Sequence, residues 1–309
     1  MRLGKLVYQL FFKPTANIRY NISHFGLKGY LKMQMGERAM KRHAATLTPI
    51  TLTSDILLEV SYLTGEKYWH QTIFCAYSLA KQLHGRVAIN VFSDGTLSQQ
   101  HINLLKRALV NINIVSPEYI KQQLEELLPP SKFPALRALR DNNPMVRKLV
   151  DVRLNNRYLV QLDSDMLFFA PPKELVDSYN TKTYYYMQDT IPSFYAMPGE
   201  RIREGLGIAL QEKINAGILA FNSAEIDWHF LERACQFLID NTEAIHAPSF
   251  EQTLNAIIIC QLNGQALNLN YRIFYANVDD YTIATDVVRH YIFKAKLEYL
   301  QWEWKKVLA

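Results

Sequence analysis

Short apolar runs alternate with amphipathic segments along most of the chain. Residues 55–63 (DILLEVSYL) and 86–92 (RVAINVF) are compact apolar runs typical of buried strands, while residues 69–83 repeat apolar side chains at helical spacing. Further strands are expected at 112–115, 157–162, 166–169, 183–187, 213–221, 266–270 and 287–293, and further helices at 97–110, 118–128, 144–156, 224–240 and 251–262, with a Trp-rich helix last. This alternation predicts an α/β fold with a mostly parallel sheet covered by helices on both faces.

Prolines punctuate the middle of this pattern. Pro129, Pro130 and Pro134 are expected to interrupt regular structure, because proline removes a backbone donor. Pro144 is instead expected to open the helix that runs to residue 156, since proline is compatible with the first helical turn.

Composition supports a large folded core. Of the 309 residues 49% are hydrophobic, and no apolar run approaches the roughly 20 residues that span a bilayer. Residues 6–12 are too short, and contain Gln9, for a convincing signal peptide. The three cysteines form no CxxC pair and are interpreted as reduced core residues, so we expect a cytoplasmic protein.

Charge divides the chain into an appendage at residues 1–50 and a body at residues 51–309. The appendage has nine Lys/Arg and a single acid, Glu37, which leaves the other 259 residues with a net charge of −3. A basic arm suits an anionic surface: membrane headgroups, nucleic acid or an acidic partner. We expect peripheral contact with the inner face of a membrane. A solvated segment packed loosely on the body is the alternative. Nucleic acid is not expected, because no aromatic-interleaved basic motif accompanies the charge.

Two carboxylates interrupt an apolar stretch at residues 158–169 (YLVQLDSDMLFF). Asp163 and Asp165 flank Ser164, and an unpaired buried carboxylate is costly, so such groups usually pair with a cation. Hard oxygen ligands at the end of a strand suit Mn²⁺ or Mg²⁺, and open α/β sheets bind ligands at that edge. An ordinary Asx turn between two strands is the alternative.

Four segments in order resemble those of the GT-A fold glycosyltransferases, most closely glycosyltransferase family 8, the group of glycogenin and bacterial lipooligosaccharide galactosyltransferases. They are Leu-Asp-Ser-Asp-Met-Leu at 162–167, Ile-Asn-Ala-Gly-Ile-Leu at 214–219, Glu-Gln-Thr-Leu-Asn at 251–255, and Arg-His-Tyr at 289–291 followed by Lys296. The resemblance spans roughly residues 55–296. It implies a GT-A domain with a mixed, mostly parallel sheet.

The resemblance implies a metal centre and a diphosphate site. Asp165 and His290 would be metal ligands, Asp163 would contact both the metal and the donor ribose, and Ser164 would lie against the donor. Lys296 would pair with the diphosphate and stabilise its growing negative charge. The family has glycine at the position of Phe293. A core histidine and a solvated lysine are the alternatives for His290 and Lys296.

The remaining donor contacts follow from the same motifs. Lys148 or Arg147 would be the basic donor contact that precedes the carboxylate motif. Asn215, Ala216 and Gly217 would place an amide near the donor sugar and allow close approach to it. Asp189 would contact a donor hydroxyl.

Catalysis at the transferred sugar is assigned to Gln252, Glu251 and Asn215. The family usually has aspartate at the position of Glu251. The alternative for Glu251 is a helix N-terminus with Ser249 as its cap. Ser61 and Tyr62, at the end of the first strand, are expected to frame the nucleotide base.

Together these features predict a metal-dependent glycosyltransferase. It would move a hexose from a nucleotide-sugar, most readily a UDP-sugar, to a glycan, glycolipid or other hydroxyl acceptor with retained anomeric configuration, as in cell-surface polysaccharide or glycolipid synthesis. Retention comes from the resemblance alone. A sugar nucleotidyltransferase is one alternative, although residues 61–67 lack its basic Gly-rich loop. An inactive protein that binds nucleotide-sugars or carbohydrate is the other.

Overall fold

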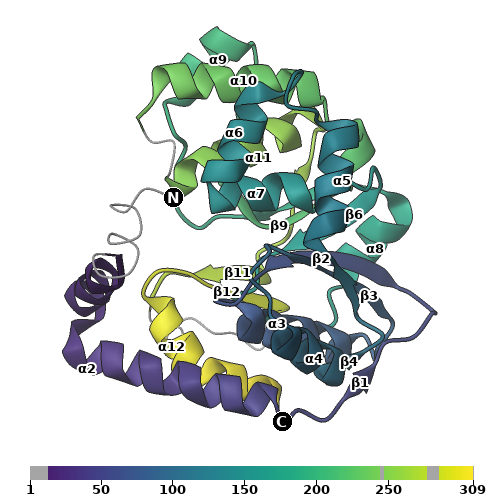
Figure 1. The fold of residues 1–309 in the computed structure, drawn as a ribbon, viewed down its shortest axis with the longest axis vertical. Helices are drawn as coiled ribbons and strands as arrows, with labels where there is room; N and C mark the ends of the chain where they lie inside the picture. The colour runs from purple at the N-terminus through teal and green to yellow at the C-terminus, as the bar shows by residue number, and fades with distance from the viewer. Residues whose placement is uncertain (1–12, 244–246, 277–284, 309) are drawn as a thin grey trace.

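A seven-stranded mixed sheet forms the centre of the molecule (Figure 1). The structure is a computed structural model that describes residues 13–243, 247–276 and 285–308, so the first twelve residues of the basic appendage lie outside it. The strand order is β10-β8-β9-β6-β2-β3-β5. The bounds are β2 (Leu58–Thr64), β3 (Val87–Ser93), β5 (Asn113–Val115), β6 (Tyr158–Leu162), β8 (Tyr185–Gln188), β9 (Ile214–Asn222) and β10 (Gln265–Ala266).

Only β9 runs against its neighbours in this sheet. It pairs antiparallel with both β6 and β8, whereas the other neighbouring pairs are parallel. The predicted mixed, mostly parallel sheet is therefore confirmed. The carboxyl ends of six strands consequently meet at one edge, where open α/β sheets bind ligands.

Two smaller sheets flank the central one. β7 (Met166–Phe168) leaves the central sheet directly after β6 and pairs antiparallel with β12 (Val288–Tyr291), which pairs parallel with β11 (Tyr271–Phe274). A two-stranded sheet joins β1 (Ile50–Thr51) to β4 (Leu109–Val110). The turn between β6 and β7 therefore lies at the junction of two sheets.

Helices cover both faces of the central sheet, each over its own apolar core (Figure 1). Phe74 of α3 belongs to one core and Ile257 of α11 to the other, and both side chains are fully buried. The helices are α3 (Trp69–Gln82), α4 (Gln99–Ala108), α5 (Pro117–Leu127), α6 (Pro134–Asn142), α7 (Pro144–Asp151), α8 (Lys173–Thr181), α9 (Gly199–Leu206), α10 (Trp228–Asn241), α11 (Pro248–Gln261) and α12 (Ala295–Gln301), with 3-10 turns η2 (Ser223–Glu225) and η3 (Glu303–Val307).

Three helix starts or ends differ from the sequence predictions. Pro134 opens α6 instead of interrupting regular structure, because its missing N–H falls in the first turn, where no intrahelical partner is needed. Helix α7 ends at Asp151, before residue 156. Helix α11 begins at Pro248, so its N-cap is Ala247, and Ser249 lies inside the first turn and is buried.

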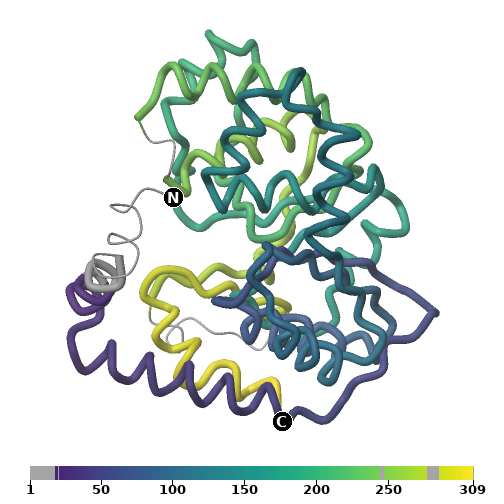
Figure 2. Tube along the Cα trace, viewed as in Figure 1, coloured from purple at the N-terminus to yellow at the C-terminus, as the bar shows by residue number. Residues whose placement is uncertain are grey.

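Most of the described part of the basic segment is a helix packed on the body. Helix α2 (Lys13–Ala44) lies alongside α12, as both traces show (Figures 1 and 2), and it is kinked at Gly26, where φ is 67°. A Cβ at Gly36 would lie 2.2 Å from the backbone oxygen of Leu300, so the two backbones approach closely. Among the described helices none is long and apolar enough to cross a bilayer. The domain boundary at residue 50 stays a prediction.

Candidate active site

The turn that carries the carboxylates is fixed by backbone hydrogen bonds from two sheets. The amide of Asp163 donates to the carbonyl of Gly217 on β9 at 2.9 Å. The carbonyl of Asp165 accepts from the amide of Tyr291 on β12 at 3.0 Å. The hydroxyl of Ser164, between them, lies 2.8 Å from that of Thr72. Both ends of the motif are thereby held in place before any ligand arrives.

Asp163, Asp165 and His290 converge on one point. One ligand atom from each lies within 4.8 Å of the others. His290 Nε2 is 3.1 Å from Asp165 Oδ1 and 3.8 Å from Asp163 Oδ2. The structure thus brings together the three residues that the sequence assigned to the metal.

This donor set fits a divalent cation such as Mn²⁺ or Mg²⁺. Two carboxylates and an imidazole are a suitable ligand set for Mn²⁺. The His290 side chain is almost fully buried, and its Nδ1 has no hydrogen-bond partner among the described residues. The ring is instead packed over Gly217, where a Cβ would lie 2.6 Å from Nδ1. Glycine is therefore needed there to admit the histidine ring.

Two lysines pair with these carboxylates from opposite sides. Lys296 Nζ lies 2.9 Å from Asp165 Oδ2, and Lys148 Nζ lies 2.7 Å from Asp163 Oδ1. Burial alone would raise the pKa of Asp165, but Lys296 and His290 outweigh it and hold that pKa well below its ordinary range. The carboxylate is accordingly charged and ready to bind a cation at neutral pH.

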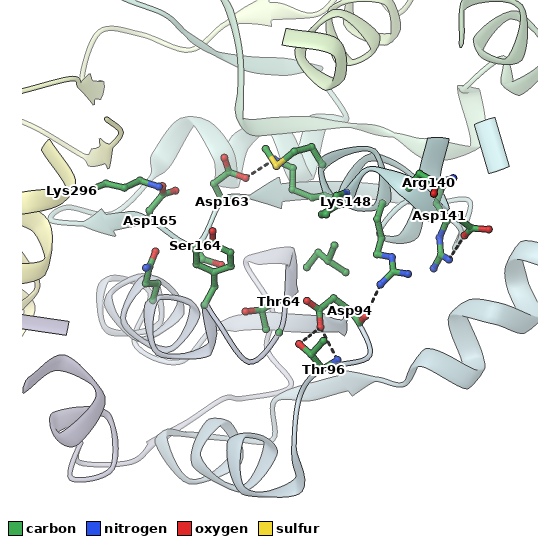
Figure 3. A pocket seen from close by; sticks show the side chains of 18 residues that line it. Thr64, Asp94, Thr96, Arg140, Asp141, Lys148, Asp163, Ser164, Asp165 and Lys296 are labelled. Atoms are coloured by element: carbon green, nitrogen blue, oxygen red, sulfur yellow. Dashed lines mark hydrogen bonds and ion pairs between the residues drawn. The ribbon is translucent and has the colours of Figure 1, made fainter. Parts of the chain in front are cut away.

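A cavity of about 460 Å³ opens beside this group, a size ordinary for a small-molecule site. In Figure 3, Lys296 and Asp165 lie at one end and Arg140 and Asp141 at the other. Six of the sequence-predicted site residues line it: Arg147, Lys148, Asp163, Ser164, Asp165 and Lys296. Cationic and anionic side chains therefore share one concave surface at the carboxyl edge of the sheet.

The wall opposite the carboxylates comes from the loops after β2 and β3, which the sequence analysis did not assign. Asp94 accepts hydrogen bonds from the amide and hydroxyl of Thr96, and its backbone oxygen accepts from Arg147 Nη1 at 2.6 Å. A Cβ at Gly65 would lie 2.0 Å from the Asp94 carboxylate. The one available signal was position, because Asp94 follows a predicted parallel strand, as Asp163 does, but it has no second carboxylate beside it to form a motif.

A buried polar network stands behind Lys148. Glu251 Oε1 lies 3.5 Å from Lys148 Nζ and accepts a hydrogen bond from Asn255 Nδ2. Asn255 Oδ1 in turn accepts from the guanidinium of Arg153, which also donates to Gln161 at 2.9 Å. Burial raises the pKa of Glu251, although Lys148 opposes the shift. Glu251 is thus joined to the site through Lys148, and its predicted contact with the sugar stays a prediction.

Four other predicted residues gather on β9, on α11 and directly after β8, outside the cavity lining. Asn215 Nδ2 donates to Asp189 Oδ2 at 3.2 Å, and Tyr275 donates its hydroxyl to Asp189 Oδ1. Gln252 Nε2 donates to the backbone oxygen of Ile214 at 3.0 Å. Ala216, next to Asn215, is buried. These residues form a second polar group, and their assigned roles at the sugar stay predictions.

Three further residues that the sequence singled out lie at the edge of the cavity lining or outside it. Ser61 and Tyr62 are buried, and it is the next residues of the chain, beginning with Leu63, that line the cavity. Phe293, where the family has glycine, adopts a positive φ of 45° and stacks on Tyr275 with its own side chain 64% exposed. The backbone here thus takes a conformation that glycine favours.

Comparison with known proteins gives matches in structure alone. No family model matches the sequence, and no curated protein does. The solved apo structure of WbbM, a bifunctional glycosyltransferase, matches with a TM-score of 0.52 at 15% identity, over 84% of this chain and 53% of that chain. The galactosyltransferase LgtC in complex with donor and acceptor sugar analogues matches with a TM-score of 0.52 at 14% identity, over 81% of this chain and 94% of that chain. The chain spans about half of WbbM and nearly all of LgtC. The predicted resemblance is confirmed at the level of the fold: this chain has the GT-A fold of these glycosyltransferases.

Proposed function

We propose that this protein is a metal-dependent glycosyltransferase that moves a hexose from a nucleotide-sugar, of which a UDP-sugar is the first to test, to a hydroxyl acceptor. The observation that carries the proposal is the convergence of Asp163, Asp165 and His290 beside a cavity on a GT-A fold. The order of the four sequence motifs gives independent support.

The charges of the site suit a diphosphate leaving group. When bound, a divalent cation supplies Lewis-acid stabilisation of the departing diphosphate. Lys296 and Lys148 hold the Asp165 and Asp163 carboxylates in the described structure. Both lysines are among the residues that line the cavity, which places them near an anionic ligand bound there. Fixed positive charge placed where negative charge develops is the commonest large contribution to such catalysis.

The metal assignment is tested by donor turnover. Purified protein is incubated with UDP-hexoses with and without Mn²⁺, and released UDP is measured. Asp165→Asn should lower metal-dependent turnover by about a hundredfold or more, because a ligand and a charge are lost together. Asp177→Asn, a matched change at an exposed site on α8, should leave it unchanged. Full activity in Asp165→Asn would remove the central assignment.

The same assays distinguish the two alternative functions. A sugar nucleotidyltransferase would form pyrophosphate from a nucleoside triphosphate and a sugar phosphate. A binding protein would show a rise in melting temperature with donor and Mn²⁺, as mass action requires, without releasing UDP.

Retention of configuration is part of the proposal and rests on the sequence resemblance. Proton NMR of the initial product gives its anomeric configuration directly. We expect the configuration of the donor, and an inverted product would remove this part while leaving the transferase assignment intact.

A further inference from the structure

Helix α2 presents an apolar stripe bordered by basic side chains to solvent. Leu27, Leu31 and Met35 follow at intervals of four residues, so they lie on one face, and they are 59%, 52% and 69% exposed. Lys28, Lys32, Arg38 and Arg42 are all exposed around them. We name these seven residues the α2 outer face. Large apolar side chains exposed together mark an interaction surface more often than scattered single ones do.

The opposite face of α2 is held against the body, so the outer face does not turn inward. Met33, Met40 and Ala44 are buried, and Gly36 brings the helix against the backbone of α12. The one acidic residue of the segment, Glu37, is paired with Lys41 at 2.7 Å. The outer face is therefore both fixed in direction and free of negative charge.

We propose that the α2 outer face lies in the headgroup region of an anionic lipid bilayer. An interfacial helix buries its apolar residues at the acyl boundary while its Lys and Arg side chains contact anionic headgroups. The positive charge of the outer face complements the negative charge of anionic lipid headgroups. A polyanion such as nucleic acid would pair with the basic residues but leave the three apolar side chains in water. A bilayer would contact both kinds of side chain, so it is the occupant that we propose.

Docking at this face would place the active site beside the membrane. Helix α12 packs against α2, and its Lys296 lines the cavity. If the proposed function holds, the acceptor hydroxyl belongs to a lipid-linked molecule. The docking itself rests on the outer face and not on the proposed activity.

Co-sedimentation with vesicles tests the proposal. The full chain is mixed with vesicles of phosphatidylcholine alone or with added phosphatidylglycerol, at low and high salt. We expect binding to the anionic vesicles that weakens with salt. Leu27→Gln, Leu31→Gln and Met35→Gln combined should weaken it roughly tenfold, because buried apolar area is lost. Lys28→Gln with Lys32→Gln should weaken it too. The matched pair Lys106→Gln with Lys121→Gln, both exposed elsewhere, should not.

Several outcomes would overturn the proposal. They are no binding of the wild-type chain to anionic vesicles, equal binding by the wild-type chain and all variants, or loss of binding in the lysine variant alone with the apolar variant unaffected. The last outcome would assign the face to a soluble polyanion. Circular dichroism checks that the variants fold. UDP release in solution is measured in parallel, and since no outer-face residue lines the cavity, its loss would concern the proposed function and not the docking.

Discussion

Gly217 lies on β9 beneath the ring of His290, and this contact sets the position of a candidate metal ligand. A Cβ at this position would lie 2.6 Å from His290 Nδ1 and 2.9 Å from Asn215 Oδ1. The amide of Gly217 also donates to Asn215 Oδ1 at 2.8 Å. One small residue thus allows the metal group and the Asn215 group to approach each other.

Gly217→Ala should therefore weaken Mn²⁺ binding by about tenfold or more. Changes that disturb the orientation of a metal ligand typically lower metal affinity by that factor. The Cβ has no space and must displace the imidazole. Calorimetric titration with Mn²⁺ measures the effect. Gly199→Ala is the matched control, because a Cβ there meets nothing within 4 Å. Unchanged affinity in Gly217→Ala would mean that His290 does not bind the ion.

At the residue scale, a motif could name side chains that lie far apart in the chain. The spacing of Asp163 and Asp165 and the family resemblance at His290 named these three residues, and the structure brings them together. Asp94 was missed because a single carboxylate after a strand has no spacing to mark it. Tyr275 was missed for the same reason, since its contact with Asp189 depends on how distant strands meet.

At the scale of elements, the contact between α2 and α12 connects the N-terminal helix to the cavity wall. Gly36→Ala should lower the free energy of unfolding by about 1–3 kcal/mol, the usual cost of overpacking. The nearest atom to the added Cβ is the backbone oxygen of Leu300, which cannot rotate away. This cost opposes the gain of about 1 kcal/mol that alanine brings to a helix interior.

Urea unfolding measures this change. Gly29→Ala on the same helix is the comparison, since the nearest atom of another element is Leu297 Cδ2 at 3.8 Å. If Gly36→Ala proved at least as stable as Gly29→Ala, α2 would not pack on α12 this closely.

Periodicity predicted most elements but not their partners. β6 and β9 are buried along nearly their whole length, so neither shows the alternation that would distinguish an antiparallel strand from a parallel one. Likewise, the strand expected at 166–169 forms but joins a different sheet from β6. Pairing is decided by tertiary packing, and a run that is buried on both faces carries little information about its neighbours.

At the scale of the whole molecule, a buried histidine makes the fold acid-sensitive. His70 has no exposed surface, and its ring nitrogens have no hydrogen-bond partner in the described part of the chain. Burial above all, then Lys41 and His101, lower the pKa of His70 from 6.5 to about 3. Glu37, at 3.7 Å, is too far for a hydrogen bond.

Because the pKa of His70 is lowered on folding, the unfolded chain binds a proton between pH 6.5 and about 3 that the folded chain excludes. Above pH 6.5 the imidazole is neutral in both states, and protonation of His70 does not lower the free energy of unfolding. Below pH 6.5 protonation of the unfolded chain lowers the free energy of unfolding by up to about 1.4 kcal/mol per pH unit. His70→Gln should make the pH dependence shallower in this window, as urea unfolding from pH 7 to 4.5 would show. The same change at the exposed His84 should keep the wild-type slope.

The pairing of β12 with β7 has a consequence for how the protein assembles. The candidate ion would join Asp165 to His290, which are 125 residues apart in the sequence and are brought together by this pairing. A bound ion would therefore link β12 to the turn after β6. It would slow local opening of β12 more than opening of β2 and β3. Fragments without residues 285–308 would contain both aspartates and all seven strands of the central sheet and still lack the histidine ligand, so binding of the ion would report that β12 is in place.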